Sequence, residues 1–128
     1  MKRVIFVSRD RDQFAELELM LNRNKLNVEW TRTGSDLLSL LSDIPKGEWI
    51  DLVVMEESLP DMDAKSLVQD LVPKSPMTNC VVAGSMEEKL FHDAYEGYGV
   101  LMQVASSPAK EDAARLETHL NKIKALQC

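Results

Sequence analysis

The sequence predicts an α/β protein in which helices cover both faces of a parallel sheet. Five short apolar runs alternate along the 128 residues with five stretches in which apolar residues recur at helical spacing. This alternation implies right-handed crossovers between parallel strands. The run at residues 52–55 is apolar on both faces, as expected for a strand that is buried on both sides. The predicted strands are residues 3–8, 26–31, 52–55, 80–83 and 100–104.

Boundary residues and apolar periodicity together define the helices between these runs. Asp10 is suited to cap the first helix, and Gln13 three residues later would complete a capping box. Proline disfavours helix in the residue before it, so Pro45 and Pro73 should end the second and third helices. Gly97 should break the fourth helix. The predicted helices are residues 11–24, 34–44, 64–72, 86–96 and 111–126.

Composition indicates one folded domain over residues 1–128. Hydrophobic residues make up 45% of the chain and charged residues 28%, which argues against a disordered protein. The formal net charge of −6 argues against a nucleic-acid surface, which needs clustered Lys and Arg. The apolar run at residues 4–7 is too short for a signal peptide or a membrane span. Cys80 and Cys128 show neither metal-ligand spacing nor a disulfide framework, so we expect a cytoplasmic protein.

The third predicted strand ends at two carboxylates. Glu56 and Glu57 close its apolar run, and a turn follows, because Pro60 fixes φ and Asp61 can bond its own backbone. Open parallel sheets bind their ligands at the C-terminal ends of their strands, so we expect the functional site at this edge. Glu57 and Asp61, taken singly, are expected to be surface acids.

Residues 51–64 resemble the phosphorylation strand and loop of response-regulator receiver domains. The family's pattern is Asp-Leu-Val-x-x-Asp followed by x-x-Leu-Pro-x-Met-Asp-Gly, and residues 51–55 and 59–63 fit it. Glu56 stands where the family has the aspartate that accepts the phosphoryl group, and Ala64 stands where it usually has glycine. The resemblance extends over the whole chain. It implies a CheY-like, flavodoxin-like doubly wound (βα)5 fold with five parallel strands in the order 2-1-3-4-5.

The resemblance implies an altered metal site at the end of the first strand. The family has an acid pair there that holds Mg²⁺ together with the acceptor, whereas this chain has Ser8 and Arg9, and Asp10 follows one residue later. Magnesium prefers hard oxygen ligands, so we expect no metal here. Two unit charges about 4 Å apart interact by roughly 4 kcal/mol at an effective dielectric constant of 20. An Arg9 guanidinium near Glu56 would therefore oppose a metal ion and could neutralise Glu56 itself.

Two further family positions also differ. Gly84 matches the Thr or Ser that ends the family's fourth strand, and Ser85 takes that position if the strand runs one residue longer. Ser107, directly before Pro108, matches the family's lysine, and an alternative register places Ala105 there. Neither register supplies an amine to contact a phosphoryl group.

The role of Glu56 remains open between two alternatives. It could be a solvated acid at a strand end, or it could mimic a permanently charged acceptor, because its carboxylate reaches about one C–C bond further than that of aspartate. Phosphorylation of Glu56 itself is disfavoured, because no metal would neutralise the incoming charge.

These departures predict a pseudo-receiver of two-component (phosphorelay) signalling that acts through protein contacts, binds no cofactor and is not an enzyme. The expected partner is a histidine kinase or a downstream effector. The resemblance places the output face on the fourth helix, fifth strand and fifth helix. Exposed Met and Tyr suit adaptable interfaces, although core packing is the commoner reason for Met at helical spacing. The matching residues are Met86, Leu90, Tyr95, Tyr98 and Met102.

Two other functions fit parts of the sequence. A working receiver with a rearranged site would hold Mg²⁺ with Asp10, Glu56 and the backbone carbonyl of Ser58. A small flavodoxin-like protein that binds a nucleotide or flavin would need Gly/Ser/Thr-rich phosphate loops, of which residues 31–35 and 83–85 are faint versions.

Overall fold

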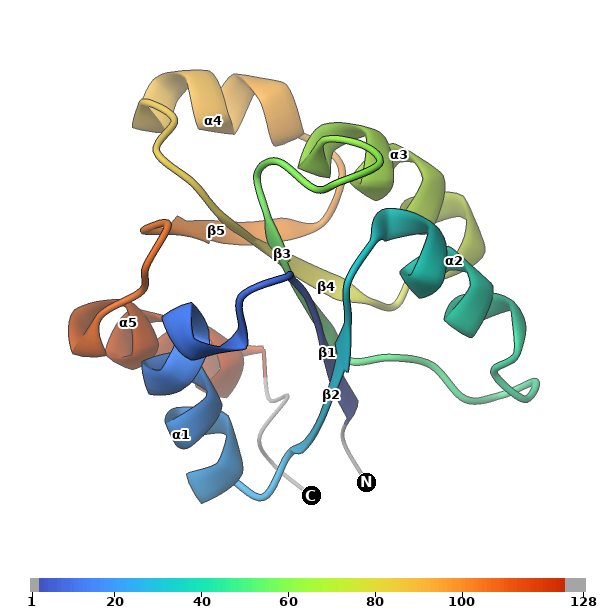
Figure 1. Cartoon of the computed structure of the whole chain (residues 1–128), viewed down its shortest axis with the longest axis horizontal. Coiled ribbons are helices and arrows are strands. Elements are labelled where there is room, and N and C mark those ends of the chain that lie inside the picture. Colours follow the sequence, from blue (N-terminus) through green and yellow to red (C-terminus); the bar gives the residue numbers. More distant parts are fainter. Residues whose placement is uncertain (1–2, 124–128) are drawn as a thin grey trace.

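Five parallel strands form one twisted sheet (Figure 1). The strands are β1 (Arg3–Val7), β2 (Asn27–Thr31), β3 (Leu52–Glu56), β4 (Asn79–Ala83) and β5 (Val100–Val104). They lie in the order β2-β1-β3-β4-β5, which confirms the predicted α/β class and strand order. The structure is a computed structural model that describes residues 3–123. Within it, Val4 of β1 lies opposite Val28 of β2 on one side and Leu52 of β3 on the other.

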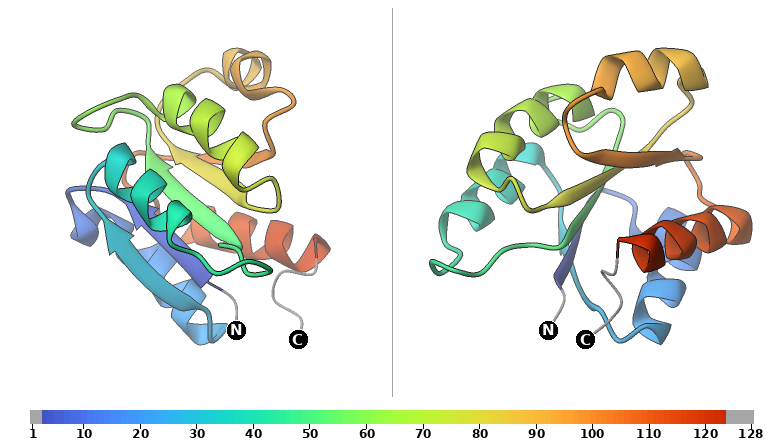
Figure 2. Two further views of the ribbon diagram at one scale, coloured as in Figure 1. Left: turned by 90° about the vertical axis from the view of Figure 1, so that its right-hand side faces the viewer. Right: turned by 180° about the vertical axis from the view of Figure 1, so that it is seen from behind.

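The helices form two layers, one on each face of the sheet (Figures 1 and 2). The helical elements are the short 3₁₀ turn η1 (Arg11–Phe14), α1 (Ala15–Arg23), α2 (Gly34–Ser42), α3 (Ala64–Lys74), α4 (Glu88–Tyr95) and α5 (Lys110–Lys122). Helices α1 and α5 cover one face, and α2, α3 and α4 lie on the other. None of the helices within residues 3–123 is long and apolar enough to cross a membrane.

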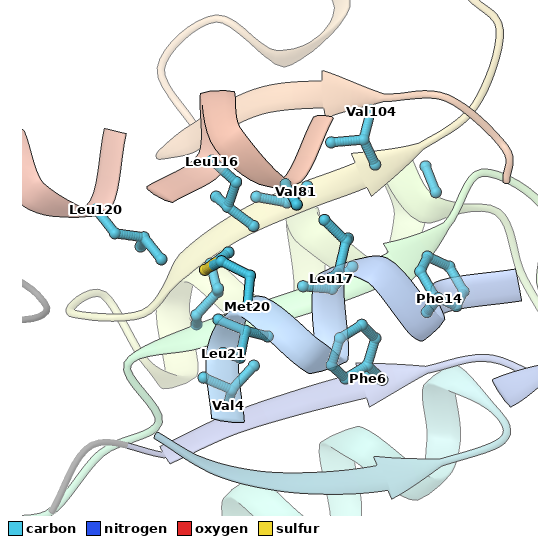
Figure 3. Close-up of a cluster of buried hydrophobic side chains, with 14 of the residues drawn as sticks. Val4, Phe6, Phe14, Leu17, Met20, Leu21, Val81, Val104, Leu116 and Leu120 are labelled. Atoms are coloured by element: carbon cyan, nitrogen blue, oxygen red, sulfur yellow. The ribbon is translucent and has the colours of Figure 1, made fainter. Parts of the chain in front are cut away.

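Side chains alternate between two hydrophobic cores along β3. Leu52 and Val54 point to the α1–α5 side, whereas Val53 and Met55 point to the α2–α3 side. Figure 3 shows the first of these cores, where side chains of α1 and α5 meet those of β1, β4 and β5. Fully burying one such side chain contributes about 1.5–3 kcal/mol. The strand that carries the candidate site is therefore firmly anchored on both faces.

Pro73 lies inside α3 and does not end it, so the predicted boundary is wrong. Because proline has no backbone N–H, Pro73 removes one intrahelical hydrogen bond. Only the last turn of α3 is affected, since Pro73 lies next to the last residue of the helix. The helix continues past it, and the backbone N–H of Ser75 still donates to the carbonyl of Leu71 at 2.8 Å.

Helix α4 begins at Glu88, two residues later than predicted. Met86 does not join the helix, because the side-chain amide of Gln103 on β5 holds its backbone. The Met86 N–H donates to Gln103 Oε1 at 2.9 Å, and Gln103 Nε2 donates to the Met86 carbonyl at 2.8 Å. The end of the predicted fifth helix, residues 124–126, lies outside the described residues.

Candidate functional site

The carboxyl end of β3 places two consecutive glutamates at the edge of the sheet. Glu56 is the last residue of β3 and lies opposite Ala83 of β4. The backbone N–H of Glu57 donates to the Ala83 carbonyl at 2.8 Å, so the second glutamate is held against β4. Both glutamates are half-buried. A cavity of about 190 Å³ opens beside them and is lined by Gln13, Glu56, Glu57, Ser58, Ala83 and Ser106.

The Glu56 carboxylate accepts hydrogen bonds from two donors near the end of β1. Its Oε2 accepts from the backbone N–H of Arg9 and its Oε1 from the side-chain amide of Gln13, each at 3.2 Å. The sequence leaves open that the Arg9 guanidinium neutralises Glu56. Its side chain is exposed, and the ion pairs found within residues 3–123 do not join it to Glu56. The donors that Glu56 has on this side are therefore a backbone N–H and a neutral side-chain amide, and neither carries a full positive charge.

Ser8 and Asp10 bond each other at the end of β1. Ser8 is buried, and its hydroxyl accepts from the Asp10 N–H at 2.9 Å while it donates to the Asp10 carbonyl at 3.2 Å. The Asp10 side chain makes no cap hydrogen bond, so the predicted capping box with Gln13 is wrong. The Gln13 amide bonds the Glu56 carboxylate instead, and hydrogen bonds to charged acceptors are stronger than those between neutral groups.

Gln13 is the site residue that the sequence reasoning missed. Its Nε2 donates both to Glu56 Oε1 at 3.2 Å and to the carbonyl of Ser106, in the loop after β5, at 2.9 Å. One neutral amide thus joins three segments at the sheet edge. The only signal in the sequence is a polar residue in the first turn after β1, directly before the buried Phe14.

Glu57 closes the other side of the cavity. A Cβ atom at Gly84 would lie 2.7 Å from Glu57 Oε2, so the glutamate occupies the space that a larger residue at position 84 would need. The same oxygen faces the backbone N–H of Ser85 at 3.4 Å. Gly84 therefore stands where the resemblance expects a hydroxyl, and a carboxylate fills that space. Glu57, expected as a plain surface acid, contacts the β4–α4 loop.

Asp61 also binds backbone N–H groups. Its two carboxylate oxygens accept from the N–H of Gly34 at 3.0 Å and of Ser35 at 2.9 Å, which cap the start of α2. These hydrogen bonds, chiefly the one from Ser35, lower the pKa of Asp61. The side chain is exposed, as expected for a surface acid, and it is also the link between the β3–α3 loop and α2.

The loop after β5 presents a carbonyl to the site and no amine. Ser106 lines the cavity through the oxygen that Gln13 binds. Ser107, which matches the family's lysine, is exposed and does not line the cavity. Ala105, the residue of the alternative register, directly follows β5 and is also exposed.

The residues of the rearranged magnesium site are only partly brought together. Ser58 lines the cavity beside Glu56, whereas Asp10 does not. In the part of the chain that the structure describes, no group of three or more His, Cys, Asp or Glu side chains is placed to hold a metal ion.

A groove of about 1300 Å³ runs between α4, β5 and α5, over the predicted output face. Met86, Tyr95 and Met102 line it, whereas Leu90 and Tyr98 do not. Leu90 is 57% exposed, and Met86 and Tyr98 are half-buried. Tyr95 and Met102 are buried in the two cores, so core packing accounts for most of their surface. Burial, with a smaller effect of the charges on Asp63 and Glu57, raises the pKa of Tyr95 to about 12.

Comparison with known proteins identifies the fold. No protein-family model matches the chain, and no curated protein matches it. Among solved structures, a response regulator from Thermotoga maritima matches with a TM-score of 0.75 and 17% identity, over 94% of this chain and 98% of that one. A CheY-like receiver domain protein from Methanospirillum hungatei JF-1 matches with a TM-score of 0.74 and 17% identity, over 99% and 97% of the two chains. The signal receiver domain of an HD domain-containing protein from Pseudomonas fluorescens Pf-5 matches with a TM-score of 0.74 and 18% identity, over 97% and 90%.

The chain therefore has the fold of response-regulator receiver domains, CheY-like and flavodoxin-like in strand order. At identities below a fifth, these matches establish architecture and leave the chemistry of the site to its own residues.

Proposed function

We propose that the chain is a pseudo-receiver of two-component phosphorelay signalling, which acts through protein contacts and without orthodox aspartyl phosphorylation. The observation that carries the proposal is the state of Glu56. It lies where the resemblance places the phosphoryl acceptor, and each of its carboxylate oxygens already accepts an N–H, from Arg9 and from Gln13. The carboxylate is thus stabilised by the protein's own donors.

The residues at this edge do not fit magnesium. The ion takes hard oxygen ligands in octahedral geometry, usually one or two carboxylates with waters and phosphate. At the end of β1 the chain offers a Ser8 hydroxyl that is already bonded to the backbone of Asp10, and the side chain of Arg9. We therefore assign no metal-dependent step, and no enzymatic turnover, to this site.

The N-terminus of α2 argues against a phosphate-binding function in the manner of a flavodoxin-like ligand protein. Backbone N–H groups at such a helix start bind anions well. Here the N–H groups of Gly34 and Ser35 bind the Asp61 carboxylate, so a phosphate would have to displace the protein's own anion.

A histidine kinase or a downstream effector is the proposed partner, and the groove between α4, β5 and α5 is the proposed contact surface. The aromatic and Met side chains in its lining, among charged ones, and the neighbouring exposed Leu90 suit a protein partner. In this proposal the chain's signalling state does not depend on phosphoryl transfer, so the partner recognises a constant surface.

Incubation with acetyl phosphate and Mg²⁺ tests the proposal, with intact mass as the readout and a phosphorylatable receiver as positive control. The wild-type chain and a Glu56→Asp variant should gain no phosphoryl group. The triple variant Ser8→Asp, Arg9→Asp, Glu56→Asp restores the three acids and is expected to gain one. A phosphoryl adduct on the wild-type chain, on Glu56 or on any aspartate, would refute the proposal and favour a working receiver with a rearranged site.

A further inference from the structure

The side-chain amide of Gln13 makes two hydrogen bonds that cross the sheet edge. Its Nε2 carries two N–H groups. Nε2 lies 3.2 Å from Glu56 Oε1 at the end of β3 and 2.9 Å from the Ser106 carbonyl in the loop after β5. Ser106 is 93 residues from Gln13 in the sequence, so this amide joins segments that lie far apart along the chain.

The loop that Gln13 holds is fixed at its other end by α5. The backbone N–H of Ala109 donates to Asp112 Oδ2 at 2.9 Å, and Arg115 donates to Asp112 Oδ1 at 2.8 Å. Pro108, between these two attachments, is buried. The loop from β5 to α5 is therefore held at Ser106 by Gln13 and at Ala105 and Ala109 by the Asp112 carboxylate in the first turn of the helix.

The same contacts continue to the groove. Arg115 also reaches the backbone carbonyl of Gln103 at 3.4 Å. The Gln103 side chain in turn makes both hydrogen bonds to the Met86 backbone, at 2.9 and 2.8 Å. Gln103, Met86 and Arg115 all line the groove. A displacement of the β5–α5 loop would thus shift Arg115, Gln103 and Met86, and with them the lining of the groove.

We infer that Gln13 is a positioning residue: with Glu56 it forms a permanent tether that fixes the β5–α5 loop and, through it, the shape of the groove between α4, β5 and α5. The inference rests on the proposed function, because the tether is the contact that would hold the output surface of the pseudo-receiver constant. Glu56 is here the acceptor for a neutral amide, and neither a metal nor a phosphoryl group enters the tether.

Nuclear magnetic resonance of the full chain tests the tether through the variant Gln13→Ala. We expect a loss of the {¹H}-¹⁵N heteronuclear NOE at Ser106 and Ser107, which reports freer motion of the loop. We also expect shifted amide and methyl resonances at Gln103 and Met86. Asn22→Ala is the matched control, because Asn22 lies on α1 with an exposed amide side chain that makes no hydrogen bond to the other residues of 3–123. It should change none of these signals.

A second variant shows whether Gln13 and Glu56 act as one unit. Glu56→Ala should give the same changes as Gln13→Ala, and the double variant should add little to either. If Glu56→Ala does not fold, Glu56→Leu, which keeps the volume and removes the acceptor, replaces it. Unchanged NOE values at Ser106 in Gln13→Ala, or additive effects in the double variant, would overturn the tether. Changes confined to residues 105–107, with Gln103 and Met86 unaffected, would overturn its link to the groove.

The phosphorylation experiment separates this inference from the proposed function. A wild-type chain that gains a phosphoryl group while Gln13→Ala behaves as expected would refute the pseudo-receiver and leave the tether in place. A chain that gains none while Gln13→Ala has no effect would refute the tether alone.

Discussion

Gly84→Ala tests how tightly Glu57 closes the candidate site. A Cβ atom at this position would lie 2.7 Å from Glu57 Oε2 and 2.9 Å from Glu57 Cδ, closer than side chains pack. The Gly84 backbone is not in the left-handed region, so conformational strain adds nothing. Glu57 must move, and the loss of its contact with the Ser85 N–H costs about 0.5–1.5 kcal/mol. Glu57 is half-buried and can move toward solvent, so this loss is the main cost, and we expect the free energy of unfolding to fall by about 0.5–1.5 kcal/mol.

Urea unfolding followed by tryptophan fluorescence measures this change. Trp30 is a suitable probe, because it stacks on the buried Phe6 with ring centroids 4.3 Å apart. The double variant Glu57→Ala/Gly84→Ala should be about as stable as Glu57→Ala alone, because the truncated side chain leaves room for the added methyl group. The steric reasoning fails if Gly84→Ala is as stable as the wild type. It also fails if Gly84→Ala destabilises both backgrounds equally.

Three further predictions follow from burial and charge. Hydrogen bonds from Ser35 and Gly34 lower the pKa of Asp61. The Asp61 carboxylate therefore stabilises the fold at pH values above the ordinary pKa of 3.8, and this contribution is lost as the pH falls through the lowered pKa. Asp61→Asn should lower the melting temperature at neutral pH, and the difference from the wild type should shrink in strong acid. Burial raises the pKa of the Cys80 thiol to about 12, so in a Cys128→Ser background a thiol reagent at pH 8 should label the protein only as urea unfolds it. Leu116→Ala, at a fully buried position between α5 and the sheet, should lower the free energy of unfolding by about 2–5 kcal/mol, measured by urea titration.

The scaffold could be predicted from the sequence because its signals are local and periodic. The fifth strand, residues 100–104, matches its predicted bounds, and β3 extends the predicted run only by Glu56. Two-sided burial of β3 follows from four consecutive apolar residues. Boundaries that depend on tertiary contacts were missed. Pro73 remains helical because it lies next to the last residue of α3, and Met86 is kept out of α4 by the side chain of Gln103 on β5.

The positions of the site could be predicted from the resemblance, but the contacts could not. Glu56 lies at the strand end, as expected, yet its partners are a backbone N–H and a glutamine. Local pattern assigned Gln13 to a capping box, because a residue three positions after Asp10 often plays that part. The competing acceptors are Glu56 and the Ser106 carbonyl, which lie 43 and 93 residues away in the sequence. A local sequence pattern cannot predict hydrogen bonds between residues so far apart.

Three acids on and after β3 each interact with a backbone N–H group of another segment, and their charges determine what this edge of the sheet can bind. Glu56 accepts the N–H of Arg9, Glu57 faces the N–H of Ser85, and Asp61 accepts N–H groups at the start of α2. Each carboxylate therefore holds a different loop by a backbone dipole. Such dipoles stabilise the carboxylates but leave their full charges in place. An anionic phosphoryl group brought to within about 4 Å of one carboxylate would meet a repulsion of roughly 4 kcal/mol at an effective dielectric constant of 20. The charges of these carboxylates, and not the hydrogen bonds that hold them, thus make the edge unfavourable for an incoming phosphate, and this repulsion is the physical basis for the constant surface proposed above.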